Sequence, residues 1–172
     1  LAELDLTGVD LSGLDLSGQD LTGTLLKDAI LDRARLASAV LAGAVLAGAR
    51  LVEVDLAGAD LSGADLAEAD LSRARLSGAQ LVDAELSAAR LPGALLDDAV
   101  AQRAIFVDAV LPGARLRRGD FLEADFERAD LSGVDATEAR FVDAMLEGAG
   151  ADRAVFDRAA MTGCRDRSEE RR

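Results

Sequence analysis

A large apolar residue recurs at every fifth position of this chain, in one unbroken register from Leu1 to Met161. These 33 core positions hold 24 Leu, 5 Phe, 1 Met and 3 Ala, and all five Phe of the protein lie among them. Two residues before each core position is a small position, which is Ala in 24 of 33 cases. A repeat this regular restricts the chain to folds that return to an equivalent point every five residues.

Neither common secondary structure accepts a five-residue repeat. On an α-helix each step turns the apolar position by about 140°, which spreads Leu over every face. On a flat strand an odd step sends successive Leu residues to opposite faces. We therefore predict that the chain turns once per repeat, with the small residue and the core residue on the same side of a short extended stretch. The two residues after each core position then form a corner.

Glycine is concentrated at these corners. Of the 16 Gly, 14 lie two residues after a core position, and Pro92 and Pro112 each directly precede such a Gly. Pro followed by Gly at the two central positions is typical of a type II turn, in which Gly supplies a positive φ. Where Arg, Asp or Glu replaces Gly, as at Arg33, Asp83 and Glu123, we expect a different turn.

The charge pattern indicates how many repeats make one coil. The outward position, directly before each core position, should stack on its equivalent in the next coil about 4.8 Å away, where opposite charges attract and like charges repel. Four repeats apart, outward positions form seven opposite pairs and one like pair. Three repeats apart the counts are five and six, and five repeats apart they are three and five. The sequence therefore favours a coil of four repeats, with Asp15, Arg35 and Asp55 as stacked neighbours.

The repeat Ala59-Asp60-Leu61-Ser62-Gly63 matches the A-(D/N)-L-x-x motif of the pentapeptide repeat family, which the chain resembles from residue 1 to about residue 164. The resemblance implies an all-β fold, a right-handed quadrilateral parallel β-helix of about eight coils that forms a rod about 40 Å long. Residues 165–172 are entirely polar, and we expect them to be disordered or a linker. Because Leu1 is already in register, we expect the natural protein to contain residues before it.

A few positions break the repeat. Gln19, Thr24 and Gly119 depart from the rule at the small position. We expect Gln19 to bow the wall or to bond to the backbone locally, because an unpaired buried amide is costly. At the core positions, Ala101 precedes Phe121 by one predicted coil, and Phe is expected to fill the space that Ala leaves.

Composition argues against catalysis. The chain has no His, Tyr or Trp, and its single Cys occupies a small position near the end, so Ser-His and Cys-His pairs are impossible. A regular rod has no pocket for acid–base work by paired carboxylates. We therefore expect a non-enzymatic protein with no catalytic residue, no metal and no cofactor. The lone Cys and the lack of a visible signal peptide favour the cytoplasm, and 18 Arg against 1 Lys suggests a bacterial genome.

The formal net charge of −13 is the main functional signal. Acidic outward positions gather in three zones, which we interpret as belts around the rod and not as a stripe along it. Solvation alone explains such charge, whereas a nucleic-acid mimic would present it to a protein that grips DNA. The candidate binding residues in the second and third zones are Asp55, Asp60, Asp65, Asp70, Asp120, Asp125, Asp130 and Asp135.

One predicted coil has apolar residues at all four outward positions, which we call the girdle: Leu95, Val100, Ile105 and Val110. A complete apolar girdle is a candidate contact surface. Aliphatic and β-branched residues also suit an extended wall without any binding role. Both interpretations of the girdle stay open at this point.

Three functions fit these patterns. The first is a non-catalytic interaction scaffold, a rigid acidic rod within a larger bacterial protein that docks protein partners. The second, implied by resemblance to the quinolone-resistance members of the family, is a DNA mimic that binds and protects DNA gyrase, although Arg residues interrupt its belts. The third is a structural spacer. We expect no direct binding of nucleic acid and no membrane insertion.

Overall fold

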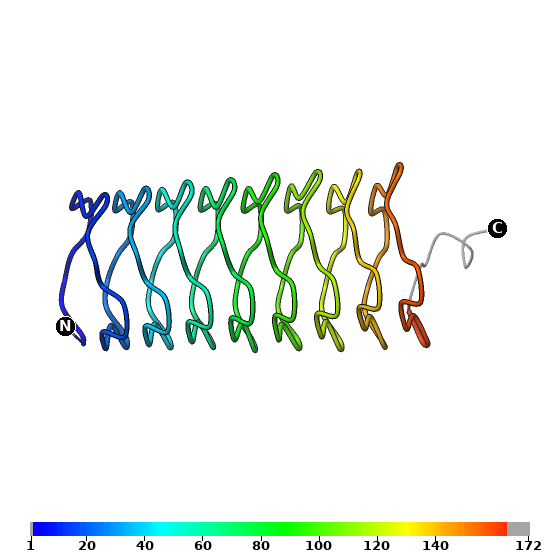
Figure 1. Ribbon diagram of the computed structural model, residues 1–172, viewed down its shortest axis with the longest axis horizontal. Helices are drawn as coiled ribbons and strands as arrows, with labels where there is room; N and C mark the ends of the chain where they lie inside the picture. Colours follow the sequence, from blue (N-terminus) through cyan, green and yellow to red (C-terminus); the bar gives the residue numbers. More distant parts are fainter. Residues whose placement is uncertain (1, 165–172) are drawn as a thin grey trace.

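The computed structural model describes residues 2–164, which wind into a stack of similar coils along one long axis (Figure 1). Within this range the chain has no helix and no strand longer than a single bridging residue. Each repeat runs from the core residue through a two-residue turn and the small residue to one residue in a parallel bridge. Accordingly, residues 2–164 contain no helix of the length and hydropathy needed to cross a membrane. Leu1 and the polar segment 165–172 lie outside the described residues.

Parallel bridges join outward positions that are four repeats apart, from Asp5 with Leu25 to Arg140 with Ala160. One coil therefore takes four repeats, and the predicted stacking of Asp15, Arg35 and Asp55 is confirmed. The outward positions form four columns along the rod. We name them by their first residues: the Asp5, Asp10, Asp15 and Asp20 columns.

In the repeats between the first and last coils, a fixed pattern of hydrogen bonds uses four of the five backbone N–H groups. Three of them donate to adjacent coils, and the fourth closes the turn. In residues 61–65 these bonds run from Leu61 to Gln80 (2.7 Å), Gly63 to Val82 (2.8 Å), Asp65 to Ala44 (2.9 Å) and Ala64 to Leu61 (3.0 Å). Contacts between coils, and not contacts within a strand, therefore hold the wall together.

Every corner uses the same backbone conformation, so the expectation of a different turn at Arg33, Asp83 and Glu123 is wrong. The second corner residue has a positive φ in all 33 repeats, at 61–75° for the 14 Gly and 55–61° for the 19 other residues. The cause is the stack. From Glu3 to Asp143, the N–H of this residue donates to the next coil, as from Arg33 to the carbonyl of Val52 (2.9 Å), and the same turn aligns that donor whatever the side chain.

The positive φ predicts a stabilising substitution at Ala88, whose φ is 56°. A left-handed conformation costs a residue with a Cβ about 1–2 kcal/mol, part of which glycine loses again through its greater freedom in the unfolded chain. Ala88→Gly should therefore raise the free energy of unfolding by roughly 0.5–1 kcal/mol in a urea titration. The reciprocal control is Gly63→Ala, where φ is +62° and a Cβ meets no atom within 4 Å. It should lower the free energy of unfolding by a similar amount. If neither variant changes the free energy of unfolding, the positive φ does not strain a residue that has a Cβ.

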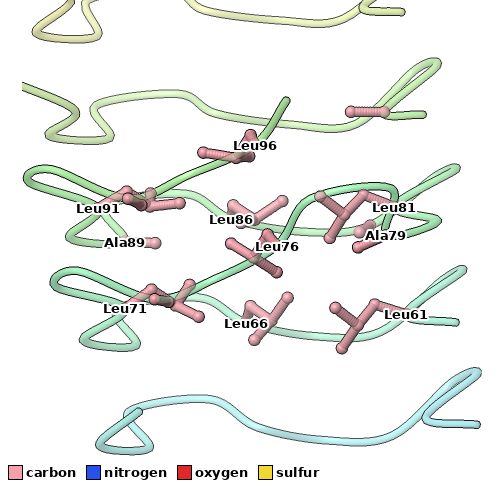
Figure 2. Packing of buried hydrophobic residues seen from close by; sticks show 14 of the residues in the cluster. Leu61, Leu66, Leu71, Leu76, Ala79, Leu81, Leu86, Ala89, Leu91 and Leu96 are labelled. Carbon is pink, nitrogen blue, oxygen red and sulfur yellow. The ribbon is translucent and has the colours of Figure 1, made fainter. Parts of the chain in front are cut away.

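The core is a set of stacked apolar columns. From Leu21 to Phe141, every core position is at most 1% exposed. Figure 2 shows the side chains of one coil lying beneath those of the next, with Leu61, Leu66 and Leu71 below Leu81, Leu86 and Leu91. The small positions let the inner wall pass close to these side chains, and most of them are also fully buried.

The exceptions in the repeat have local explanations. Gln19 is exposed, so its amide is not buried, and the reason for expecting it to bow the wall or to bond to the backbone locally does not apply. A small position is covered by the preceding coil, and no described coil precedes Gln19. The Phe residues pack together, with ring centroids 4.6 Å apart for Phe106 and Phe126 and 5.1 Å apart for Phe121 and Phe141. The buried Ala101 lies one coil before Phe121, as expected.

Candidate functional site

The outward aspartates bind the fifth backbone N–H of the repeat. This donor belongs to the first corner residue, and it bonds to Oδ1 of the aspartate two residues earlier, as from Ser62 to Asp60 at 3.0 Å. The geometry explains why the motif prefers Asp at this position. All eight predicted acidic binding residues accept such a bond, at 2.9–3.2 Å: Asp55, Asp60, Asp65, Asp70, Asp120, Asp125, Asp130 and Asp135.

Corners that follow an outward residue without a carboxylate satisfy this requirement differently. Pro112 follows the outward Val110, and proline has no N–H to satisfy. After the outward Arg50, the N–H of Val52 donates to Oδ1 of Asp32 in the adjacent coil (3.1 Å). The acidic pattern is therefore partly a structural requirement of the wall, and position in the stack must distinguish a binding carboxylate from a purely structural one.

Hydrogen bonds lower the pKa of several outward carboxyls. The Arg117 guanidinium and then the Thr137 hydroxyl bond to Asp135 and lower its pKa to about 2. The hydroxyl and the N–H of Ser132 lower the pKa of Asp130. In each case the donors favour the charged form of the carboxyl, because they bond to its ionised oxygens.

These shifts predict a loss of stability in acid. A carboxyl whose pKa is lower in the folded chain stabilises the fold above its unfolded value of 3.8, and that contribution disappears as pH falls toward about 2. The midpoint of thermal unfolding should therefore fall progressively between about pH 4 and about pH 2. Asp135→Asn keeps an acceptor oxygen but does not titrate, so its midpoint should fall less steeply. A wild-type slope in this variant would contradict the assignment.

The girdle residues lie on four different columns. Leu95, Val100 and Val110 are half-buried, and Ile105 is 36% exposed. Each is flanked along its column by charged or polar residues, as Ile105 is by Glu85 and Asp125. One partner surface can therefore face at most two adjacent girdle residues at once. Their role in contact stays a prediction.

The stacking of coils determines which charged residues lie along the same side of the rod. Within residues 2–164, the Asp5 column holds acidic residues at Asp5, Asp65, Glu85 and Asp125 and has no Lys or Arg. We define the acidic face as this column with the corner before it and the corner after it. Its charged residues are Glu3, Asp5, Asp28, Asp65, Glu68, Asp83, Glu85, Asp108, Glu123, Asp125, Glu127, Asp143 and Glu147, with Lys27, Arg103 and Arg128.

The charge of the rod is therefore asymmetric. The acidic face carries thirteen acidic and three basic residues, whereas the rest of residues 2–164 carries sixteen acidic and twelve basic residues. The predicted belts are present, because the eight acidic residues of the second and third zones lie two on each of the four columns. The expectation of no stripe is wrong, because few basic residues lie on the acidic face and most lie on the other sides of the rod. The net charge is concentrated along one side of the rod.

Other reactive groups are few. Within residues 2–164, no three carboxylate, thiol or imidazole side chains are grouped so that they could hold a metal ion. The Cys164 thiol donates to the carbonyl of Phe141 (2.9 Å), and burial raises the pKa of this thiol. The expectation of no catalytic residue, metal or cofactor stays a prediction.

A family model for pentapeptide repeats matches eight copies in this sequence, between residues 1 and 118 and over residues 124–163. The chain belongs to the pentapeptide repeat family. The five-residue period of the sequence is the period of the matched repeats.

Two solved structures illustrate the likeness. HetL, a pentapeptide repeat protein involved in heterocyst differentiation regulation in the cyanobacterium Nostoc, is 29% identical, with a TM-score of 0.60 over 98% of this chain and 87% of HetL. A trypsin-treated variant of QnrB1, a plasmid-mediated fluoroquinolone resistance protein, is 16% identical, with a TM-score of 0.50 over 95% of this chain and 93% of QnrB1. No curated protein gives a significant match to the sequence.

Proposed function

We propose that this pentapeptide repeat protein is a non-catalytic scaffold, a rigid acidic rod that binds protein partners through its outer faces in the bacterial cytoplasm. The frame we propose is a right-handed four-sided β-helix of about eight coils. One observation carries the proposal. Backbone hydrogen bonds between coils and the Asp caps leave a uniform wall, on which the outward and corner side chains are the variable feature. A wall of this kind is suited to holding surface groups at fixed spacing.

Capture from a bacterial extract tests the scaffold. The immobilised rod should enrich a specific protein over the same rod unfolded by acid. Val100→Asp with Ile105→Lys should weaken capture if the girdle takes part. The matched control places the same changes at Val40 and Val45, which occupy the same two columns three coils earlier. No protein enriched by the folded rod would contradict the scaffold, and full capture by the girdle variant would exclude the girdle.

A second candidate is a DNA mimic that binds DNA gyrase. The observation in its favour is the acidic face, which runs along the rod as a line of negative charge. The fold shared with QnrB1 supports only the architecture of the rod and not its binding partner. The test is a supercoiling assay with purified gyrase and a fluoroquinolone, with and without the rod. Under this candidate the rod restores supercoiling, and no effect at micromolar rod would dismiss it.

A further inference from the structure

We propose that the acidic face is the docking surface for a basic, partly aliphatic segment of a partner protein, and that a notch beside Gly48 anchors one cationic side chain of that segment. This inference rests on the proposed scaffold function, to which it adds the place of binding and the chemistry of the partner.

Charged residues on the rest of the rod neutralise one another. Outside the acidic face, thirteen pairs of charged residues occupy equivalent positions in adjacent coils, and all thirteen combine opposite signs. Some form ion pairs, such as Asp15 with Arg35 at 2.8 Å and Asp98 with Arg118 at 2.7 Å. These sides of the rod satisfy their own charges along the stack.

The acidic face does not follow this rule. Six pairs of charged residues occupy equivalent positions in adjacent coils there, and three of them combine like signs. The like pairs are Asp65 with Glu85, Glu123 with Asp143, and Glu127 with Glu147. Like charges stacked at about 4.8 Å repel and lower stability. A sequence that avoids this repulsion elsewhere and retains it on one face breaks a local rule where function is expected.

Exposed aliphatic side chains lie in the same column. Leu25, Ile105 and Met145 are 41%, 36% and 38% exposed, and they are three of the five most exposed large apolar residues at outward positions. Carboxylates interleaved with aliphatic groups match a segment that carries both Lys or Arg and apolar side chains. Charge complementarity therefore requires a partner segment with positive charge. The aliphatic groups favour a protein segment over a simple polycation.

A notch of about 220 Å³ lies at the corner that follows this column. Ala47 and Gly48 form its centre, with Lys27 and Asp28 in the coil on one side and Ala67 and Glu68 in the coil on the other. The notch is narrow at Gly48, where a Cβ would lie 2.5 Å from Oδ1 of Asp28. Its two carboxylates outnumber the one lysine, so the notch keeps a net negative charge beside an apolar floor. This combination suits an Arg or Lys side chain, whose methylene groups pack on the alanines.

Binding of a defined peptide to charge variants tests the face. The probe is a fluorescent peptide in which Leu-Lys-Arg is repeated five times. The face variant carries Asp65→Asn, Glu85→Gln and Asp125→Asn, and the control carries Asp60→Asn, Asp70→Asn and Asp130→Asn. Both sets lose three charges and keep the oxygen that caps the corner. The face variant should bind at least about tenfold more weakly and the control less than about threefold.

Filling the notch tests the anchor. Gly48→Asn adds a side chain that tolerates the left-handed conformation and occupies the notch. Gly43→Asn is the control, at φ +64° with no atom within 4 Å of an added Cβ. Only the first change should weaken the peptide, by about fivefold or more. Circular dichroism melting of each variant establishes that the rod is folded.

The outcomes separate this inference from the scaffold. Equal losses in the two charge variants, or no binding of the peptide by the wild-type rod, would overturn the acidic face as the docking surface. Equal affinity in the Gly48 and Gly43 variants would overturn the anchor. Each of these results leaves capture of a partner from extract unaffected, whereas failure of that capture overturns the scaffold itself.

Discussion

Phe121→Ala is expected to lower the free energy of unfolding by about 3–5 kcal/mol, a larger loss than any substitution on the outer wall should cause. Phe121 is fully buried, and its ring centroid lies 5.1 Å from that of Phe141, 5.7 Å from Phe126 and 6.3 Å from Phe106. The cavity would remain open, because hydrogen bonds between coils hold the walls at fixed spacing and Ala101 in the adjacent coil adds no bulk.

The control for this substitution is Phe156→Ala near the end of the rod. Phe156 is half-buried, and its ring contacts Phe141 at 5.8 Å. Its loss should be about 1 kcal/mol. Urea unfolding followed by circular dichroism measures both variants, and amide hydrogen exchange reports whether opening is confined to neighbouring coils, as a solenoid permits. Equal losses of stability at the two positions would contradict the prediction that the buried Phe121 stabilises the rod more than the half-buried Phe156.

Gly119→Ala is expected to lower the free energy of unfolding by about 1–3 kcal/mol, although alanine is the usual residue at small positions. The φ of Gly119 is not in the left-handed region, so its conformation does not require glycine. Space does. An added Cβ would lie 2.5 Å from Cε2 of Phe121 and 3.2 Å from the carbonyl oxygen of Leu116. The ring is fully buried and contacts Phe106, Phe126 and Phe141, so moving it away from the added Cβ is costly.

A double-mutant cycle isolates that clash. In a Phe121→Leu background the ring atoms are absent, so Gly119→Ala should cost less than about 1 kcal/mol. Gly150→Ala is a control at an outward position, where an added Cβ meets no atom within 4 Å, and it should change stability by less than about 0.5 kcal/mol. A penalty at Gly119 that is the same with Phe and with Leu at position 121 would rule out the ring as its cause.

Much of the fold follows from the repeat because one local constraint acts 33 times. The inward Leu residues, the corners and the four-repeat coil were all predictable from spacing and charge. The conformation of the corners was only half predictable. A glycine such as Gly63 predicts a positive φ, but Arg33 and Ala88 adopt it too. The bond that their N–H groups donate to the adjacent coil cannot be predicted from the local sequence.

The candidate site was less accessible to prediction. The aspartates stood out by their charge, yet their bonds to corner N–H groups appear only once the turn is built. Gly48 looked like any other corner glycine. Its place between Asp28 and Glu68 makes it the floor of a notch, and those residues belong to three different coils.

The sequence by itself determined the period, the apolar interior and the family, because each depends on residues a few positions apart. The tertiary structure alone decided which charges are neighbours. Asp65 and Glu85 are bridged across adjacent coils although the chain makes a full circuit of the rod between them. Charges and hydrogen-bonding groups act strongly over only a few ångströms, so their partners are set by the stacking of coils. That stacking places most of the basic residues on the other sides of the rod and leaves one face acidic.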